Sequence, residues 1–205
     1  MNVNLQLYIY ETMKILFVRH GESVDDVEDR YGGWADFDLT GRGKEQLIET
    51  AEKISSFSEK FEVVLSSPLK RAFQASEILA NQLDIDIEVF EYLKERNLNG
   101  ILTGLTRSEA NQKYPEQVAT HNNWEYVDGS ERTEDFNNRV RHAIKYLLKM
   151  EYNSIIAVTH GIFMKAFYKE MMHLDINKVD DGGFVLVEEN DSKFEVLKEY
   201  RIEYA

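Results

Sequence analysis

Four short apolar runs alternate along this chain with segments of helical periodicity, and this alternation constrains the fold more than any other feature. The runs, at 14–19, 62–66, 85–90 and 154–159, are rich in β-branched side chains, as buried strands are. Strands that alternate with helices pair in parallel and are joined by right-handed crossovers. The sequence therefore predicts an α/β fold, a three-layer α/β/α sandwich with a mostly parallel sheet.

The spacing of apolar residues and the signals at helix ends place the helices between these strands. Two more strand-like runs, at 183–187 and 194–197, are separated by turn residues, so we expect a hairpin that adds an antiparallel edge. Helices are predicted at about 40–59, 68–83, 106–114, 131–150 and 162–173.

The length of the chain suits one domain. Its 205 residues allow a sizeable core, and 43% hydrophobic residues describe a soluble globular protein. Residues 1–12 alternate polar and apolar types, as an edge strand does, but chain termini are commonly untethered. We expect an N-terminal extension at 1–12 and a single domain at 13–205.

Net charge and missing residue types exclude several functions. A net charge of −13 argues against a nucleic-acid partner, which requires a basic face. The absence of cysteine excludes a cysteine-based phosphatase and fits a cytoplasmic protein. No apolar run approaches the ~20 residues of a membrane span, and there is no secretory signal. No membrane partner is expected, whereas a homodimer is left open.

Two strand ends carry an imidazole each. The first strand ends in Arg19 and His20, at the edge where open α/β sheets bind their ligands. Arginine can grip two phosphate oxygens, and an imidazole can act as a nucleophile. The run at 154–159 leads into His160 and Gly161, and the helix that follows presents unpaired N–H groups to an anion. Two such ends together predict a phosphate site.

Two further segments offer groups that suit the same chemistry. Ser67 is expected to cap a helix that begins at Pro68, which places Arg71 in its first turn. A cation there opposes the helix dipole, so a nearby anion explains it better than solvent does. Glu95 offers a carboxyl group that could act as an acid, although an isolated Glu-Arg pair is commonly a surface ion pair.

Six ordered motifs span most of the chain: RHGES at 19–23, GGWADFDLTGRG at 32–43, SSPLKRA at 66–72, LKERNLNG at 93–100, GSERTEDFNNRV at 129–140 and VTHG at 158–161. With this set the chain resembles the histidine phosphatase superfamily, in its phosphoglycerate mutase-like branch. In that family the first histidine is phosphorylated, two arginines and the second histidine hold the phosphoryl group, and a glutamate donates a proton. The resemblance implies those catalytic roles for His20, Arg19, Arg71, His160 and Glu95.

The resemblance also implies an activity, that of a phosphomonoester phosphatase that acts on a small phosphorylated metabolite through a phosphohistidine. His20 would attack phosphorus, the cations would neutralise the phosphoryl oxygens, and Glu95 would protonate the leaving alkoxide and later activate water. Neither a metal nor another cofactor is expected, because the arginines do the work that Mg²⁺ does elsewhere.

Ser23, Gly32 and Gly33 are further candidates for substrate binding, as is Gly161. The Ser23 hydroxyl could donate to phosphate or only satisfy a turn. The two adjacent glycines lie in a loop that borders the substrate in the family, or are required by a turn. The acidic run at 25–29 departs from the Trp-Asn that mutases carry there, and would disfavour a highly anionic substrate unless it faces away.

Three alternative functions compete with the phosphatase. A cofactor-dependent phosphoglycerate mutase would return the phosphoryl group to a second hydroxyl. Mutases that resemble the family carry a longer insertion with paired arginines, whereas residues 104–129 hold only Arg107 and Lys113 as cations. A silent phospho-ligand binder commonly lacks one catalytic group, and all are present here. A metal hydrolase is disfavoured because Arg19 and Arg71 would repel a divalent cation. We therefore expect the phosphatase.

Overall fold

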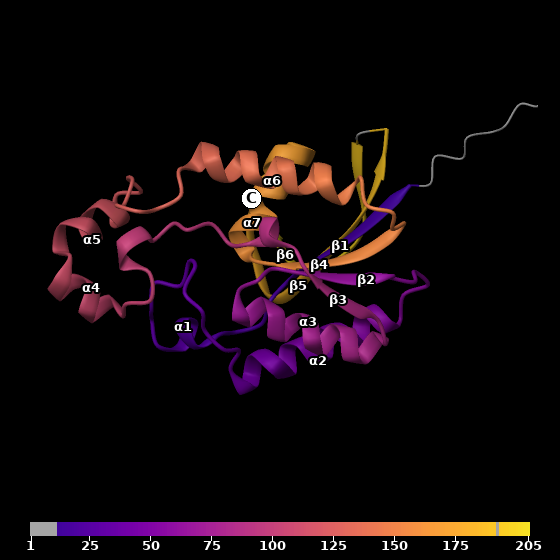
Figure 1. Ribbon diagram of the computed structural model, residues 1–205, viewed down its shortest axis with the longest axis horizontal. Coiled ribbons are helices and arrows are strands. Elements are labelled where there is room, and N and C mark those ends of the chain that lie inside the picture. Colours follow the sequence, from indigo (N-terminus) through magenta and orange to yellow (C-terminus); the bar gives the residue numbers. More distant parts are fainter. Residues whose placement is uncertain (1–11, 192) are drawn as a thin grey trace, which may run out of the picture.

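The computed structural model describes residues 12–191 and 193–205, which form helices on both sides of one sheet (Figure 1). The strands are β1 (Met13–Arg19), β2 (Val63–Ser66), β3 (Asp86–Val89), β4 (Ser154–Thr159), β5 (Ile176–Asn190) and β6 (Lys193–Tyr204). The α-helices are α1 (Val24–Val27), α2 (Gly41–Ser55), α3 (Lys70–Leu83), α4 (Arg107–Lys113), α5 (Pro115–Asn122), α6 (Thr133–Leu147) and α7 (Gly161–Phe167). Short turns of other helix types are η1 (Glu91–Leu93), η2 (Gly100–Leu102) and η3 (Tyr168–Met172).

The six strands form one sheet in the order β3-β2-β4-β1-β5-β6. β3, β2, β4 and β1 are parallel to one another, and β5 and β6 add an antiparallel edge beside β1. The predicted α/β fold with an antiparallel edge is confirmed. The predicted extension at 1–12 lies outside the described residues except for Thr12, whose hydroxyl donates to Glu188 Oε1 at 2.9 Å.

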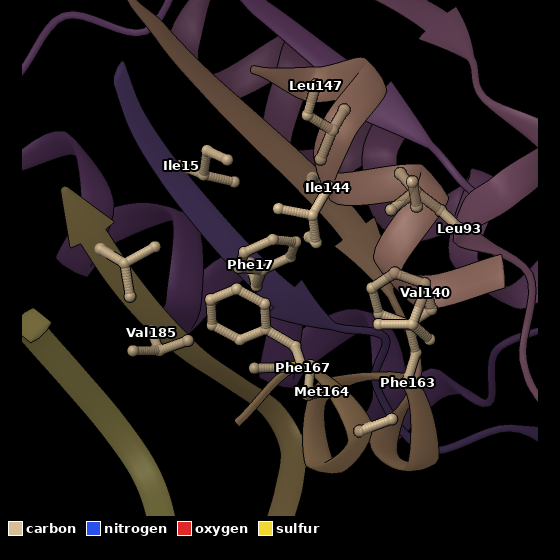
Figure 2. Packing of buried hydrophobic residues seen from close by; sticks show 14 of the residues in the cluster. Ile15, Phe17, Leu93, Val140, Ile144, Leu147, Phe163, Met164, Phe167 and Val185 are labelled. Carbon is tan, nitrogen blue, oxygen red and sulfur yellow. The ribbon is translucent and has the colours of Figure 1, made fainter. Parts of the chain in front are cut away.

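Helices cover both faces of the sheet, and each face has its own core. Figure 1 shows α6 and α7 above the sheet and α2 and α3 below it. Side chains of β1 alternate between the two layers, as the strand repeat requires. Ile15 and Phe17 belong to the cluster with α6 and α7, and Leu16 and Val18 to the cluster with α2 and α3. Phe17 packs against Phe167 of α7, with ring centroids 4.5 Å apart (Figure 2).

α4 and α5 lie apart from the two helix layers, at the left end of Figure 1. They form a small unit with its own buried residues: Tyr31, Leu102, Ala110, Val118 and Val127. The loop after β1 is joined to this unit because Tyr31 N donates to Leu105 O at 2.9 Å. None of the described helices is long and apolar enough to cross a membrane.

The predicted start of the second helix is wrong. α3 begins at Lys70 with Leu69 as its N-cap, and no side chain caps it. The hydroxyl of Ser67, the predicted cap, instead lies 2.8 Å from His160 Nε2. A contact between two strand ends therefore overrides the local capping signal, although Arg71 still lies in the first turn.

Other boundaries also differ from the prediction. The predicted helix at 162–173 divides into α7 and the π-helical turn η3, which ends at His173 with φ +57°. α1 and α5 were not predicted. Pro115 ends α4 as expected but is also the first residue of α5, a position where the missing N–H of proline costs nothing. The hairpin strands extend well beyond the predicted runs, since β5 already begins at Ile176.

Candidate active site

The order of the strands brings the two predicted histidines together. β1 and β4 are parallel neighbours, and Arg19 pairs in register with Thr159. The next residue of each strand end is a histidine, so His20 and His160 emerge side by side at the carboxyl edge of the sheet. Their ring centroids lie 5.0 Å apart with an interplanar angle of 65°.

Hydrogen bonds define the protonation of His20. Its Nδ1 lies 2.7 Å from Gly21 O, a pure acceptor, so the ring proton sits on Nδ1. Nε2 then carries the lone pair and accepts from Arg71 Nε at 3.1 Å. Burial lowers the pKa of His20 well below its ordinary value, and the charges of Arg71 and Arg19 lower it further. The imidazole is therefore neutral near pH 7 and can act as a nucleophile through Nε2.

Arg71 is held rigidly over His20. Its Nη1 and Nη2 each donate at 2.9 Å, to Ala35 O and Gly33 O of the loop after β1. The side chain is buried, and burial lowers its pKa while Asp25 and Glu95 oppose that change. An arginine remains a cation under these conditions. It therefore brings a fixed positive charge to the nitrogen that would attack phosphorus.

His160 is oriented by Ser67 of the neighbouring strand end. Ser67 Oγ accepts from Leu69 N at 3.4 Å and lies 2.8 Å from His160 Nε2. We assign the hydroxyl proton to Nε2, which leaves the ring proton on Nδ1. Nδ1 is buried and has no hydrogen-bond partner in the described part of the chain. Burial, and then Arg71, lower the pKa of His160 well below its ordinary value, so the ring is neutral.

The guanidinium of Arg19 contacts the protein through its two Nη atoms, while its Nε has no partner in the described part of the chain. Its Nη1 donates to Val179 O at 2.5 Å, and its Nη2 lies 2.8 Å from Asp181 Oδ1 without the alignment of a hydrogen bond. Arg19 Nε is buried and finds no acceptor among residues 12–191 and 193–205. Burial raises the pKa of Asp181, and Arg19 opposes that change. The guanidinium thus keeps one inward donor available for an anion.

Glu95 comes to the same place from a loop. Its Oε1 accepts from Arg96 N at 2.8 Å, and its Oε2 accepts from Ile162 N, in the first turn of α7, at 3.2 Å. Burial raises the pKa of Glu95, while these two N–H groups, Arg71 and Arg19 oppose the increase. A buried carboxyl group with a raised pKa can hold a proton for a leaving oxygen.

Of these groups, Arg19, His20 and Glu95 line a crevice of about 220 Å³, whereas Arg71 and His160 contact His20 from outside its lining. Arg19, His20, Glu95 and Gly161 form its inner part, and the remaining lining residues are Ile162, Lys165, Asn177, Lys178 and Val179. Within the described residues there is no group of three or more His, Asp or Glu side chains that could hold a metal ion. The arrangement is suited to binding a tetrahedral anion between cations beside an unprotonated imidazole.

Ser23, Gly32 and Gly33, also predicted to bind substrate, are not among the residues that line this crevice. Ser23 is fully buried, and its hydroxyl donates to Asp25 Oδ1 at 2.6 Å. A Cβ at Gly32 would lie 2.1 Å from Asp25 Oδ2, so only glycine fits there, and Gly33 has φ +57°. All three shape the loop that holds Arg71, and direct substrate binding by them stays a prediction. Asp25 is buried rather than at the mouth of the crevice.

Sequence reasoning missed three contributors. Ser67 could have been found, because it directly follows β2 as His160 directly follows β4. Asp181 precedes an apolar run at the same edge of the sheet, which is a weak signal. Arg139 of α6 donates to the carbonyl oxygens of Lys94 and Glu95, and nothing in its helical position indicates that contact.

Comparison with known proteins agrees with this geometry. The chain is 28% identical over 196 residues to phosphoserine phosphatase 1 of Hydrogenobacter thermophilus, with 91% of each chain covered. It is 29% identical over 227 residues to the 2,3-bisphosphoglycerate-dependent phosphoglycerate mutase of Streptococcus gordonii, covering 92% of this chain and 98% of the relative. The solved alpha-ribazole phosphatase from Shigella flexneri has the same fold, with a TM-score of 0.77 at 22% identity and 94% and 96% of the two chains covered.

The family model of the histidine phosphatase superfamily (branch 1) matches residues 15–198, which include every residue of the crevice. A match of that extent, on a chain with two neighbouring strand-end histidines, identifies this protein as a member of the histidine phosphatase superfamily.

Proposed function

We propose that this protein is a metal-independent phosphomonoester phosphatase that acts on a small phosphorylated metabolite through a phosphohistidine at His20. The observation that carries the proposal is a pair of buried donors beside His20, Arg19 Nε and His160 Nδ1, which have no acceptor in the described chain. Leaving a buried donor unpaired costs about 1–3 kcal/mol. A phosphoryl group in the crevice would satisfy both donors.

The proposed first step is phosphoryl transfer to His20. The lone pair of Nε2 attacks phosphorus while the bond from phosphorus to the leaving oxygen breaks. Arg71 Nε, Arg19 Nε and His160 Nδ1 donate hydrogen bonds to the phosphoryl oxygens, and the two guanidinium charges neutralise them. The proton of the Glu95 carboxyl group passes to the leaving oxygen, which departs as an alcohol.

The second step returns the enzyme to its starting state. Water attacks the phosphorus of phosphohistidine, and the Glu95 carboxylate takes one of its protons. The bond from Nε2 to phosphorus breaks, and inorganic phosphate leaves. The arginines supply the positive charge that a divalent metal supplies in other phosphoryl-transfer enzymes.

Phosphoglycerate mutase is the alternative, and the placement of the nearby cations favours the phosphatase. Arg107 pairs with Asp29 at 3.3 Å and lies over the Tyr31 ring at 3.8 Å, so its charge is engaged away from the crevice. The test is a panel of phosphorylated metabolites in the presence of chelator. Release of inorganic phosphate supports the proposal, whereas conversion of 3-phosphoglycerate to 2-phosphoglycerate with bisphosphoglycerate would favour the mutase.

Arg71→Ala is expected to weaken the binding of phosphate or vanadate by about 1.5–3 kcal/mol, because a charge-assisted hydrogen bond is lost. Titration of the free protein by calorimetry measures this. Lys70→Ala is the matched control, because Lys70 is the neighbouring cation in α3 but pairs with Asp38 at the surface. Equal affinity in the Arg71 variant and the unmodified protein would contradict the assigned phosphate site.

The outer wall of the crevice indicates the chemistry of the leaving group. Lys165 and Lys178 lie there in a chain of net charge −13. Lys178 pairs with Asp180 at 2.6 Å, whereas Lys165 has no ion-pair partner among the described residues. A leaving group with its own carboxylate would pair with Lys165. The relative named phosphoserine phosphatase 1 is named for a substrate of this class, and we extend the proposal to carboxylated phosphomonoesters.

Lys165→Ala should raise the KM for a carboxylated ester such as phosphoserine about two- to fivefold, the value of a partly exposed ion pair. The KM for glycerol 2-phosphate, which has no carboxylate, should not change. Lys169→Ala, one helical turn away and paired with Asp175, is the control. Equal changes for both esters would show that Lys165 does not contact the leaving group.

The cytoplasmic location and the homodimer stay predictions.

A further inference from the structure

The Glu95 loop has no regular secondary structure to hold it. Residues 94–99 lie between the single turns η1 and η2 and form no strand or helix. Proton transfer nevertheless requires the carboxyl group to sit within a fraction of an ångström of its place. Some other part of the protein must therefore fix this segment.

All five N–H donors of Arg139, in α6, bond to the Glu95 loop or to the residues that flank it. Nη1 donates to Lys94 O at 2.7 Å and to Tyr92 O at 3.0 Å. Nη2 donates to Glu95 O at 3.1 Å and to Glu131 Oε2 at 2.8 Å, and Nε donates to Glu131 Oε1 at 2.8 Å. A guanidinium has five donors, so none is left for substrate.

Glu131 holds the loop on the other side of Glu95, so that Arg139 and Glu131 together form a clamp around the proposed acid. Its backbone N donates to Asn97 O at 2.7 Å, and its Oε2 accepts from Asn97 N at 3.3 Å. The side chains of Arg139 and Glu131 are only 16% and 13% exposed, so the pair is shielded from solvent. The loop is thus held at Lys94, directly before the proposed acid, and at Asn97, two residues after it.

We infer that the Glu131–Arg139 pair is the positioning device of the general acid, and that it sets the rate of leaving-group protonation without touching substrate. The inference rests on the proposed role of Glu95. Arg139 holds the carbonyl of Glu95, and Arg96 N, the next backbone group, holds its carboxyl oxygen. A shift of the loop therefore moves the carboxyl group directly.

The test uses two variants of the full chain, Arg139→Lys and Glu131→Gln. Lysine keeps the charge but cannot contact three carbonyls and a carboxylate in one plane. Single-turnover phosphorylation of His20 is measured with glycerol 2-phosphate, which needs a proton on its leaving oxygen, and with p-nitrophenyl phosphate, which does not. We expect Arg139→Lys to slow the first reaction about 10- to 100-fold, as a small misplacement does, and the second less than about threefold.

Two controls separate positioning from general loss of structure. Arg141 lies on the same helix and pairs with Glu170. The variant Arg141→Lys should leave both rates unchanged. Vanadate affinity should stay the same in every variant, because the phosphate donors are on other segments. If Arg139→Lys does not fold, Glu131→Gln, which keeps the side-chain shape, carries the same expectation. Equal slowing of both substrates in the folded variant would overturn the inference.

A double variant distinguishes failure of this inference from failure of the proposed function. With Glu95→Gln already present, Arg139→Lys should slow glycerol 2-phosphate no further, since the group it positions is gone. Additive losses would overturn the positioning role. If Glu95→Gln alone spares glycerol 2-phosphate, the acid assignment itself fails. If only Glu95→Gln slows it, the acid role stands and the clamp is merely structural.

Discussion

Replacing His20 by alanine is expected to lower turnover on the order of 10⁴-fold or more, the effect of removing a covalent nucleophile. His20 Nε2 carries a lone pair that accepts from Arg71 Nε at 3.1 Å. The neighbouring His160 cannot replace it, because its Nε2 lies 2.8 Å from Ser67 Oγ and its Nδ1 carries the proton. Rapid-quench experiments with labelled ester should detect no acid-labile, base-stable phosphoenzyme in the variant.

The variant should still fold and still bind vanadate. The His20 ring contacts Gly21 O and Arg71 and belongs to neither hydrophobic cluster of the sheet. Thermal unfolding and vanadate titration check this, and His142→Ala, an exposed histidine of α6, serves as the control. Residual activity of more than a few per cent, or a phosphoenzyme trapped on another residue, would remove His20 from the nucleophile role.

Glu95→Gln is expected to slow phosphorylation by an alkyl phosphate on the order of 10²–10⁴-fold, the usual contribution of a general acid. An alkoxide is strongly basic and must receive a proton as the bond to phosphorus breaks, whereas nitrophenolate leaves without one. Glutamine keeps the side-chain shape but supplies no acidic proton. The rate with p-nitrophenyl phosphate should therefore change much less. Equal losses on both substrates would pass the acid role to another carboxylate near the nucleophile, either Glu22, two residues after His20, or one of the run at 25–29.

The pH dependence follows from the direction of the pKa shifts. Burial raises the pKa of Glu95, so the carboxyl group keeps its proton above its ordinary range and loses it as the pH rises through the raised value. The rate with an alkyl phosphate should fall across that interval, and Glu95→Gln should abolish this dependence. Burial lowers the pKa of His20, so loss of the nucleophile to protonation occurs only at more acidic pH and affects both substrates.

Local sequence patterns predicted the fold class and four of the five catalytic candidates. β1 and β4 are buried, mostly apolar runs, and such runs are readable because burial on both faces demands apolar side chains. Residues that directly follow such strands gather at one edge of the sheet, which made His20 and His160 conspicuous. Glu95 lies in a loop without a pattern; its residue type suggested an acid, and the resemblance to a family implied the catalytic role.

Helix boundaries were less predictable where distant contacts compete with local signals. The pair Ser67-Pro68 has the features of a helix start, yet α3 begins at Lys70 because the Ser67 hydroxyl contacts His160. The π-helical turn before His173 is likewise unreadable from apolar spacing, because a turn of five residues is too short to show a period of its own.

The sequence by itself indicated the chemistry that we propose for the chain, since the proposed nucleophile, the cations and the carboxyl group are all readable by residue type. Only the tertiary structure decided how these groups are held and which donors stay available. Arg19 bonds to Val179 O, which is 160 residues later in the sequence, and Ser67 contacts His160, which is 93 residues later. Glu95 is held by Arg139, 44 residues later. Contacts of this kind depend on strand order and helix packing, and a one-dimensional pattern carries no signal for them.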